Sequence, residues 1–178
     1  PDAHAALLRG VQELIERDAL MTTWLHGLSG RAVAPPDPLA SEVARLSGEF
    51  TVLDLTPAYS PFPVAAVMGG IPKRGVWRYS LGVACKHDWE SAAEKAYLEW
   101  NQGVLFAGIY GELTDVSRIR KNSELHSFDE HAMYYTLYPE LWPELPILRE
   151  KNVLHVPSRR AAPEEPRRAL EVARKALL

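Results

Sequence analysis

Residues 7–19 form a short stretch that combines two different helical patterns. Leu7, Val11, Leu14 and Ile15 recur at spacings of three and four, which predicts an amphipathic helix with one apolar stripe. Such a helix is stable in a globular protein only when its apolar stripe is buried against another element. The rest of the chain must therefore provide a surface on which this helix packs.

The opposite flank of the same helix is charged. Glu13 and Glu16 lie one turn apart, and Arg17 lies beside both of them. Mg²⁺ prefers oxygen ligands and shares them with phosphates, while the guanidinium of Arg matches phosphate oxygens. The flank indicates a site for a divalent cation and a phosphate; the alternative is a solvated surface with weak ion pairs.

A second helical stretch begins near Ser91, which fits a capping box together with Glu94. Its small and aromatic residues predict one buried face, made of Ala92, Ala93, Ala96, Tyr97, Trp100 and Val104. Lys95, Glu99 and Gln102 lie on another face. An acid in such apolar surroundings needs a partner if it is buried. Glu99 is therefore a candidate second source of metal ligands.

Together the two stretches resemble the YcaO family, the ATP-dependent enzymes that activate peptide backbone amides. The family signature S-x-x-E-x-x-E-R corresponds here to Gly10-x-x-Glu13-x-x-Glu16-Arg17, and the signature E-x-x-Q corresponds to Glu99-Trp100-Asn101-Gln102. Each motif is short, but their order and spacing make the combination specific. The resemblance covers residues 1–146.

A third segment, residues 128–135, resembles the acidic, histidine and aromatic segment of the azoline-forming members of the family. Two positions depart from the family pattern. Gly10 replaces the serine of the first signature, and Lys95 stands where some members carry asparagine. The first change removes a hydroxyl group, and the second replaces a metal ligand with a side chain suited to phosphate.

The resemblance implies ATP and Mg²⁺ as cofactors. It assigns Glu13, Glu16 and Glu99 to the metal, and Arg17, Lys95, Glu99 and Gln102 to the nucleotide. It identifies no catalytic base within this stretch.

The activity implied by the resemblance is cyclodehydration of a ribosomally made precursor peptide, in which Cys, Ser or Thr becomes a thiazoline or oxazoline. Two alternatives remain open: thioamidation of a peptide, and a non-catalytic subunit that binds a leader peptide and keeps degenerate ATP motifs. The expected partners are a precursor peptide with its leader segment, a leader-binding protein and a second copy of the chain.

Composition narrows the other classes of function. The 178 residues fit a single domain, 1–178, and a formal net charge of −3 gives no electrostatic argument for nucleic acid binding. No apolar run is long enough to cross a membrane, and one cysteine fits a reducing cytoplasm. Because Pro1 leads directly into a helix and the last helix reaches Leu178 without a cap, we expect a fragment of a longer protein.

Strands are expected at residues 49–55, 64–68 and 77–83, with a hairpin loop at residues 69–75 between the last two. Residues 32–38 are expected to form a loop because they are rich in proline. This order predicts an α+β fold, a two-layer sandwich with helices packed on one face of a mainly antiparallel sheet.

Two other chemistries, a thiol nucleophile and a zinc site, have weaker support in the sequence. Cys85 and His87 lie two residues apart, but no third group supports a thiol nucleophile. His126 and His131 lack the spacing of a zinc site, so capping or structural roles are expected for them.

Overall fold

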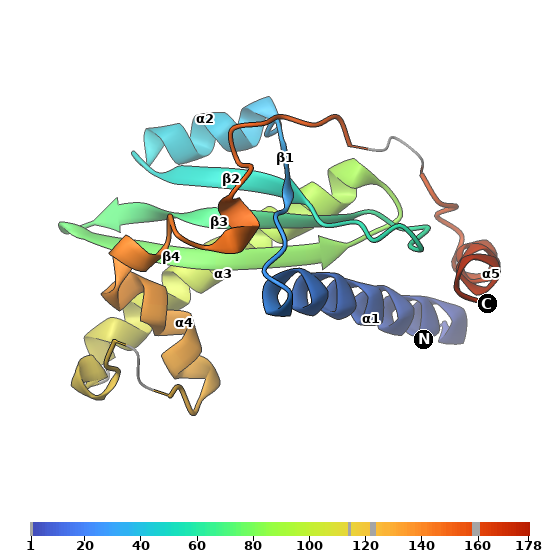
Figure 1. The fold of residues 1–178 in the computed structure, drawn as a ribbon. Helices are drawn as coiled ribbons and strands as arrows, with labels where there is room; N and C mark the ends of the chain where they lie inside the picture. Colours follow the sequence, from blue (N-terminus) through green and yellow to red (C-terminus); the bar gives the residue numbers. More distant parts are fainter. Residues whose placement is uncertain (1, 114, 122–123, 158–160) are drawn as a thin grey trace.

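The computed structural model describes residues 2–113, 115–121, 124–157 and 161–178 (Figure 1). The helices are α1 (Ala3–Leu25), α2 (Asp37–Arg45), α3 (Trp89–Leu113), α4 (Phe128–Leu137) and α5 (Pro166–Leu177), with short 3₁₀ helices η1 (Val116–Arg118), η2 (Pro139–Leu141) and η3 (Pro146–Leu148). The strands are β1 (Arg31–Val33), β2 (Glu49–Asp54), β3 (Val64–Lys73) and β4 (Val76–Cys85).

The four strands form one antiparallel sheet in the order β1-β2-β3-β4. β3 and β4 are joined by a tight turn in which Arg74 and Gly75 have φ angles of 54° and 80°, as expected for a two-residue hairpin. The predicted hairpin is confirmed, but its strands are longer than expected because Gly69 and Gly70 continue the ladder. β1 is a strand that the sequence predicted as a loop; it pairs with β2 from Arg31 onward.

Helices cover both faces of this sheet. Residues of β3 alternate between the two faces, with Ala65 and Val67 packed in a cluster with α3 and Val64, Ala66 and Met68 packed in a cluster with α1. Figure 1 shows α3 behind the strands and α1 across the opposite side. The predicted α+β class and antiparallel sheet are confirmed, whereas helical packing extends beyond the single face that was expected. The reason is that β3 is apolar on both sides rather than alternately polar.

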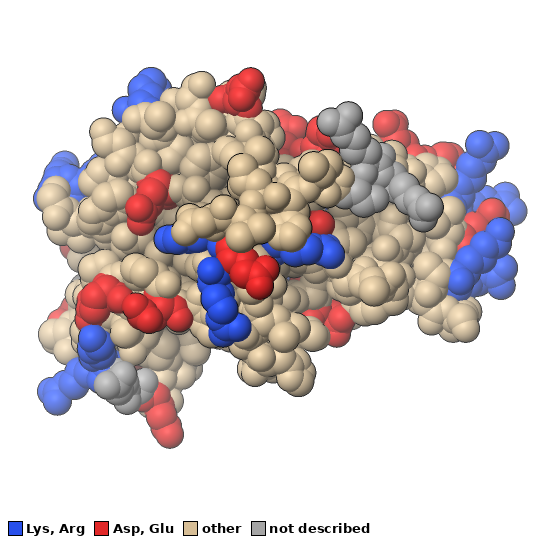
Figure 2. All heavy atoms as spheres, turned by 45° about the horizontal axis from the view of Figure 1, so that its top comes forward, with Lys and Arg blue, Asp and Glu red and all other residues tan. Residues whose placement is uncertain are grey.

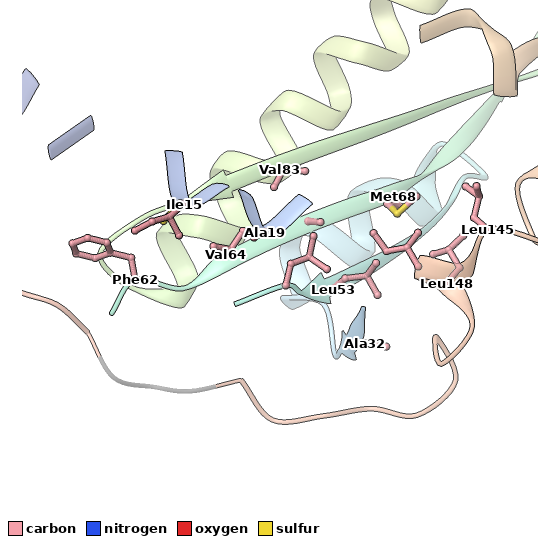
Figure 3. Close-up of a cluster of buried hydrophobic side chains, with 14 of the residues drawn as sticks. Ile15, Ala19, Ala32, Leu53, Phe62, Val64, Met68, Val83, Leu145 and Leu148 are labelled. Carbon is pink, nitrogen blue, oxygen red and sulfur yellow. The ribbon is translucent and has the colours of Figure 1, made fainter. Parts of the chain in front are cut away.

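The cluster on the α1 side joins elements from along the whole chain (Figure 3). Ile15 and Ala19 of α1 meet Val64 and Met68 of β3, and the segment after α4 contributes Leu148. Burial of aliphatic side chains of this size stabilises the fold by roughly 1.5–3 kcal/mol each. This cluster fixes α1 against the end of the sheet.

The apolar stripe of α1 differs from the one predicted. Ile15 is buried and Val11 half-buried as predicted, whereas Leu7 and Leu14 are 60% and 71% exposed and Leu8 and Ala19 are buried in their place. The helix is therefore rotated about its axis relative to the prediction. Apolar side chains occur on two sides of α1, and only the position of the sheet decides which side is buried.

Charged side chains of both signs are interspersed on the face shown in Figure 2, and basic ones gather at the end formed by α5. This distribution agrees with the small net charge of −3. Within the residues that the structure describes, no helix combines the length and the hydropathy needed to span a membrane.

Candidate ATP and metal site

α1 presents two acids toward the open edge of β4. Glu13 is exposed and Glu16 is half-buried, one turn further along the helix. Gln12, directly before Glu13, and Ile15, directly before Glu16, are buried, so this part of the helix is held firmly against its neighbours. Packing of the α1 core stripe therefore sets the direction of both carboxylates.

α3 approaches the same strand from the other face of the sheet. A Cβ atom at Gly82 of β4 would lie 2.0 Å from the carbonyl oxygen of Ala96 and 2.3 Å from the amide nitrogen of Trp100. Only glycine permits such close contact between the strand and the helix backbone. The contact brings Lys95 and Glu99 beside the end of β4.

The two helices and the end of β4 enclose a cavity of about 370 Å³, which we call the α1–α3 cavity. Its lining is almost entirely polar or charged: Arg9, Gln12, Glu13, Glu16, Arg17, Cys85, Lys86, Lys95 and Glu99. Five of the six residues that the sequence assigned to metal or nucleotide thus line one cavity, although they come from two helices far apart in the sequence.

Glu16 lies at the centre of this arrangement. One of its carboxylate oxygens, Oε2, accepts a hydrogen bond from the backbone N–H of Cys85 at 3.1 Å. Burial raises the pKa of Glu16, the Cys85 hydrogen bond opposes this, and the charges of Glu99 and Glu13 raise the pKa further. Glu16 therefore lies close enough to two other carboxylates to be repelled by both, an environment that a cation stabilises.

The other two carboxylates have cationic partners on their own helices. Arg17 donates to Oε1 of Glu13 from Nε at 2.9 Å and from Nη2 at 2.6 Å. The ammonium group of Lys95 lies 3.0 Å from Oε1 of Glu99. Both pairs join residues four apart on an exposed or half-exposed helix surface, a class of interaction that is weak.

The comparison with known families agrees with this geometry. Residues 1–177 match the family model described as YcaO cyclodehydratase, ATP- and Mg²⁺-binding. The chain belongs to the YcaO family. A search of curated proteins gives no match.

Several solved structures share this fold. A heterocyclase in complex with substrate and cofactor superposes with a TM-score of 0.66 at 22% identity, covering 99% of this chain and 24% of the other. The *E. coli* microcin synthetase McbBCD complex gives a TM-score of 0.66 at 17% identity, covering 92% of this chain and 43% of the other. The heterocyclase TruD gives 0.57 at 22% identity, covering 99% and 24%. The chain thus spans less than half the length of the proteins it resembles.

The family description confirms ATP and Mg²⁺ as the predicted cofactors. Among the described residues, no three His, Cys, Asp or Glu side chains are arranged to hold a metal ion as they stand. The YcaO acids Glu13 and Glu99 each give one oxygen to a neighbouring cation, and Glu16 gives one to the Cys85 amide. Each carboxylate therefore keeps a second oxygen that is available to a further ligand, and oxygen ligands are those that Mg²⁺ prefers.

Gln102 is the predicted site residue that the structure leaves outside the cavity. Its side chain is exposed, one turn beyond Glu99 on α3, and it is absent from the cavity lining. Its assignment to the nucleotide remains a prediction from the family motif.

Sequence reasoning missed four residues of the lining: Arg9, Gln12, Cys85 and Lys86. Arg9 is one turn before Glu13 and has the same helical spacing that identified Arg17, so the signal was present in the sequence. Lys86 follows the last residue of β4 and carries no sequence signal of its own. Only the folding of the β4 end between the two helices brings it to the cavity.

The Cys85 side chain lacks the properties of a nucleophile. Burial raises the pKa of its thiol to about 12, and the nearby charge of Glu16 adds to this increase. His87 lies 2.6 Å from Asp88 and 3.5 Å from Glu164, which are the partners shown for its ring nitrogen Nε2. The structure thus agrees with the expectation from the sequence that Cys85 is not a nucleophile.

Proposed function

We propose that this protein is an ATP- and Mg²⁺-dependent cyclodehydratase that converts Cys, Ser or Thr residues of a ribosomally made precursor peptide into thiazolines or oxazolines. Glu13, Glu16 and Glu99 hold Mg²⁺ in the α1–α3 cavity, and basic side chains around them bind the phosphates of ATP. Its single cysteine is compatible with reducing conditions, so we expect the reaction to take place in the cytoplasm.

One observation carries this proposal: acids from α1 and α3 line a single cavity of about 370 Å³ together with four basic residues. A volume of this size is in the range of small-molecule sites. Carboxylates provide the ligands that Mg²⁺ prefers, and Lys and Arg neutralise phosphate oxygens. A cavity lined by both acidic and basic side chains suits a metal–polyphosphate complex better than it suits a metal ion or a phosphate alone.

The chemistry follows from the need to expel a poor leaving group. The side chain of the substrate Cys, Ser or Thr attacks the preceding backbone carbonyl, and the resulting tetrahedral oxygen takes the γ-phosphoryl group of ATP, leaving ADP. The amide nitrogen then loses its proton, the C–O bond breaks, and phosphate departs as the C=N bond of the azoline forms. When bound, Mg²⁺ neutralises phosphate charge, and the protein positions the reacting groups.

The expected partners follow from one of the similar structures. The McbBCD complex with pro-MccB17 bound resembles this chain with a TM-score of 0.63 at 17% identity. A multi-protein synthetase holding its precursor supports the inference that this protein also works on a precursor peptide and with partner subunits. A leader-binding protein and a second copy of the chain remain predictions from the family resemblance.

The test is ATP turnover by the protein in the presence of a Cys-containing precursor peptide, with the product analysed by mass spectrometry. Cyclodehydration gives a product lighter by one water. Replacement of oxygen by sulfur would show thioamidation instead. Absence of peptide-stimulated turnover would identify a scaffold and end the enzyme assignment.

Matched variants locate the activity in the cavity. Glu13→Gln and Glu99→Gln each remove a carboxylate charge and are expected to lower turnover by about 100-fold or more, the scale of a lost charge-stabilising interaction. Glu94→Gln is the control because Glu94 is exposed on α3 and outside the cavity lining. Turnover that responds equally to all three changes would remove the cavity from the mechanism.

A further inference from the structure

The four basic residues of the α1–α3 cavity fall into two groups. Arg17 and Lys95 each contact a carboxylate of the cavity, at 2.6 Å and 3.0 Å. Arg9 and Lys86 line the same cavity but form no ion pair with any residue that the structure describes. Among the described residues, the positive charges of the cavity that form no ion pair are therefore those of these two side chains.

Lys86 is held in place by the sheet. Its backbone N–H donates to the carbonyl oxygen of Pro63 at 3.3 Å, and the preceding residue, Cys85, pairs with Val64 of β3. The ammonium group of Lys86 is close enough to Glu16 to lower that residue's pKa, against the dominant effect of burial. Because its backbone is hydrogen-bonded to the residue before β3, Lys86 is held directly beside the sheet, which suits it to receive a ligand.

Arg9 lies on the other wall of the cavity. It is exposed on α1, one turn before Glu13, and its guanidinium offers the forked donor geometry that matches phosphate oxygens. Arg9 and Lys86 therefore approach the cavity from a helix and from the sheet edge, with the acids Glu13 and Glu16 near them.

The balance of charges in the cavity also separates Arg9 and Lys86 from Arg17 and Lys95. When Arg17 and Lys95 neutralise Glu13 and Glu99, the remaining charges of the cavity are the Glu16 carboxylate and the two cations Arg9 and Lys86. A bound Mg²⁺ neutralises only part of a triphosphate, so further positive charge is needed on the phosphate oxygens. Arg9 and Lys86 can provide this charge without first leaving an ion pair, unlike Arg17 and Lys95.

We propose that Arg9 and Lys86 bind the phosphate oxygens of ATP, whereas Arg17 and Lys95 neutralise the metal-binding carboxylates until Mg²⁺ arrives. The inference rests on the proposed function, because it requires ATP in the α1–α3 cavity. It differs from the family motif, which assigned the phosphates to Arg17 and Lys95.

The test compares four single variants, Arg9→Ala, Lys86→Ala, Arg17→Ala and Lys95→Ala, by titration calorimetry with the Mg²⁺ complex of a non-hydrolysable ATP analogue. A lost charge-assisted hydrogen bond corresponds to about a 10-fold or greater change in affinity. We expect that loss for Arg9→Ala and Lys86→Ala, and a change of less than about threefold, the scale of a weak surface pair, for the other two. Lys86→Arg is expected to restore binding, and Lys73→Ala, exposed at the far end of β3, is the control.

A second measurement separates binding of the phosphates from loss of the fold or the metal. Binding of Mn²⁺ without nucleotide, followed by electron paramagnetic resonance, is expected not to weaken in Arg9→Ala or Lys86→Ala, because removing positive charge does not repel a cation. Equal nucleotide affinity in wild type and these variants, or an equally large loss in Arg17→Ala or Lys95→Ala, overturns the assignment while the proposed function stands. Failure of the wild-type protein to bind the analogue overturns both.

Discussion

The carboxylate of Glu16 accepts a hydrogen bond from the backbone N–H of Cys85, with 3.1 Å between Oε2 and the nitrogen. The contact joins α1 to the open edge of β4, since the other side of Cys85 pairs with Val64 of β3. α3 packs against the same strand at Gly82. This hydrogen bond therefore lies where the acids of two distant helices come together.

The first prediction concerns the stability of Glu16→Gln. Folding raises the pKa of Glu16 above its ordinary value of 4.5, mainly through burial, so the native state favours the protonated form. The stability that this group contributes is present below pH 4.5 and is lost as the pH rises through the folded pKa. We expect Glu16→Gln to be more stable than wild type at pH 7 and to lose that advantage near pH 4.

Thermal unfolding between pH 4 and pH 7 measures the difference in stability between Glu16→Gln and wild type. Nucleotide turnover measures the loss of activity. The variant keeps an oxygen that accepts the Cys85 hydrogen bond but loses the metal-binding charge, so turnover is expected to fall by about 100-fold or more. Saturating Mg²⁺ and ATP analogue should stabilise wild type by about 2.7 kcal/mol at 100 times Kd, and the variant by much less. A variant less stable than wild type at pH 7 would show that the carboxylate is not strained by its surroundings.

The second prediction tests the contact between β4 and α3. Gly82→Ala places a methyl group 2.0 Å from the carbonyl oxygen of Ala96 and 2.3 Å from the amide nitrogen of Trp100. Both of these are backbone atoms, which cannot turn aside as a flexible side chain can. Overpacking of this kind typically costs about 1–3 kcal/mol, and more where backbone must move. We expect Gly82→Ala to lower the free energy of unfolding by about 3 kcal/mol in urea denaturation and to weaken nucleotide binding by moving Glu99.

The matched control for Gly82→Ala is Gly75→Asn in the β3–β4 turn. Its φ of 80° is in the left-handed region that Asn tolerates, and a Cβ there contacts nothing within 4 Å. We expect a much smaller loss of stability and unchanged nucleotide binding. A Gly82→Ala variant as stable as this control would mean that α3 and β4 are less closely packed than the structure shows.

How far the sequence predicts this fold is clearest in the two helices of the site. All six residues of the predicted apolar face of α3 are buried, and the small side chains on that face allow the close approach of α3 to β4 at Gly82. On α1 the same reasoning correctly selected Ile15, which is buried, but also selected Leu7 and Leu14, which are exposed. Local periodicity finds a helix, but a helix with apolar residues on two sides is oriented only by its tertiary neighbours.

In the site, too, some residues could be predicted from local sequence patterns and others depend on tertiary structure. The family motifs identified Glu13, Glu16, Arg17, Lys95 and Glu99, all of which line the α1–α3 cavity. Lys86 was missed because its position depends on the register of β3 with β4, which no local pattern contains. The contacts of Arg17 and Lys95 with carboxylates follow from i,i+4 spacing and were available from the sequence, but the motif directed attention to phosphate instead.

The third prediction concerns the thiol of Cys85. Its pKa, raised to about 12 from 9.0 mainly by burial, means about 1000-fold less thiolate than an ordinary cysteine below pH 9. We expect the native protein to react with a thiol-specific dye about 1000-fold more slowly than the urea-unfolded chain at pH 8. Because the folded pKa is raised, stability that is present below pH 9 is lost as the pH rises toward 12. Rapid labelling of the native protein at pH 8 would contradict this prediction.

The last prediction concerns Gly10, which stands at the serine position of the first YcaO signature. A Cβ at this position meets nothing within 4 Å, so Gly10→Ser and Gly10→Ala both fit on the surface of α1. Helix propensity predicts gains in stability of roughly 0.5 kcal/mol for serine and about 1 kcal/mol for alanine. Because Gly10 is absent from the lining of the α1–α3 cavity, the two variants should bind the ATP analogue equally. Denaturation in urea and calorimetry check both statements, and tighter nucleotide binding by Gly10→Ser alone would show that the serine hydroxyl reaches the ligand after all.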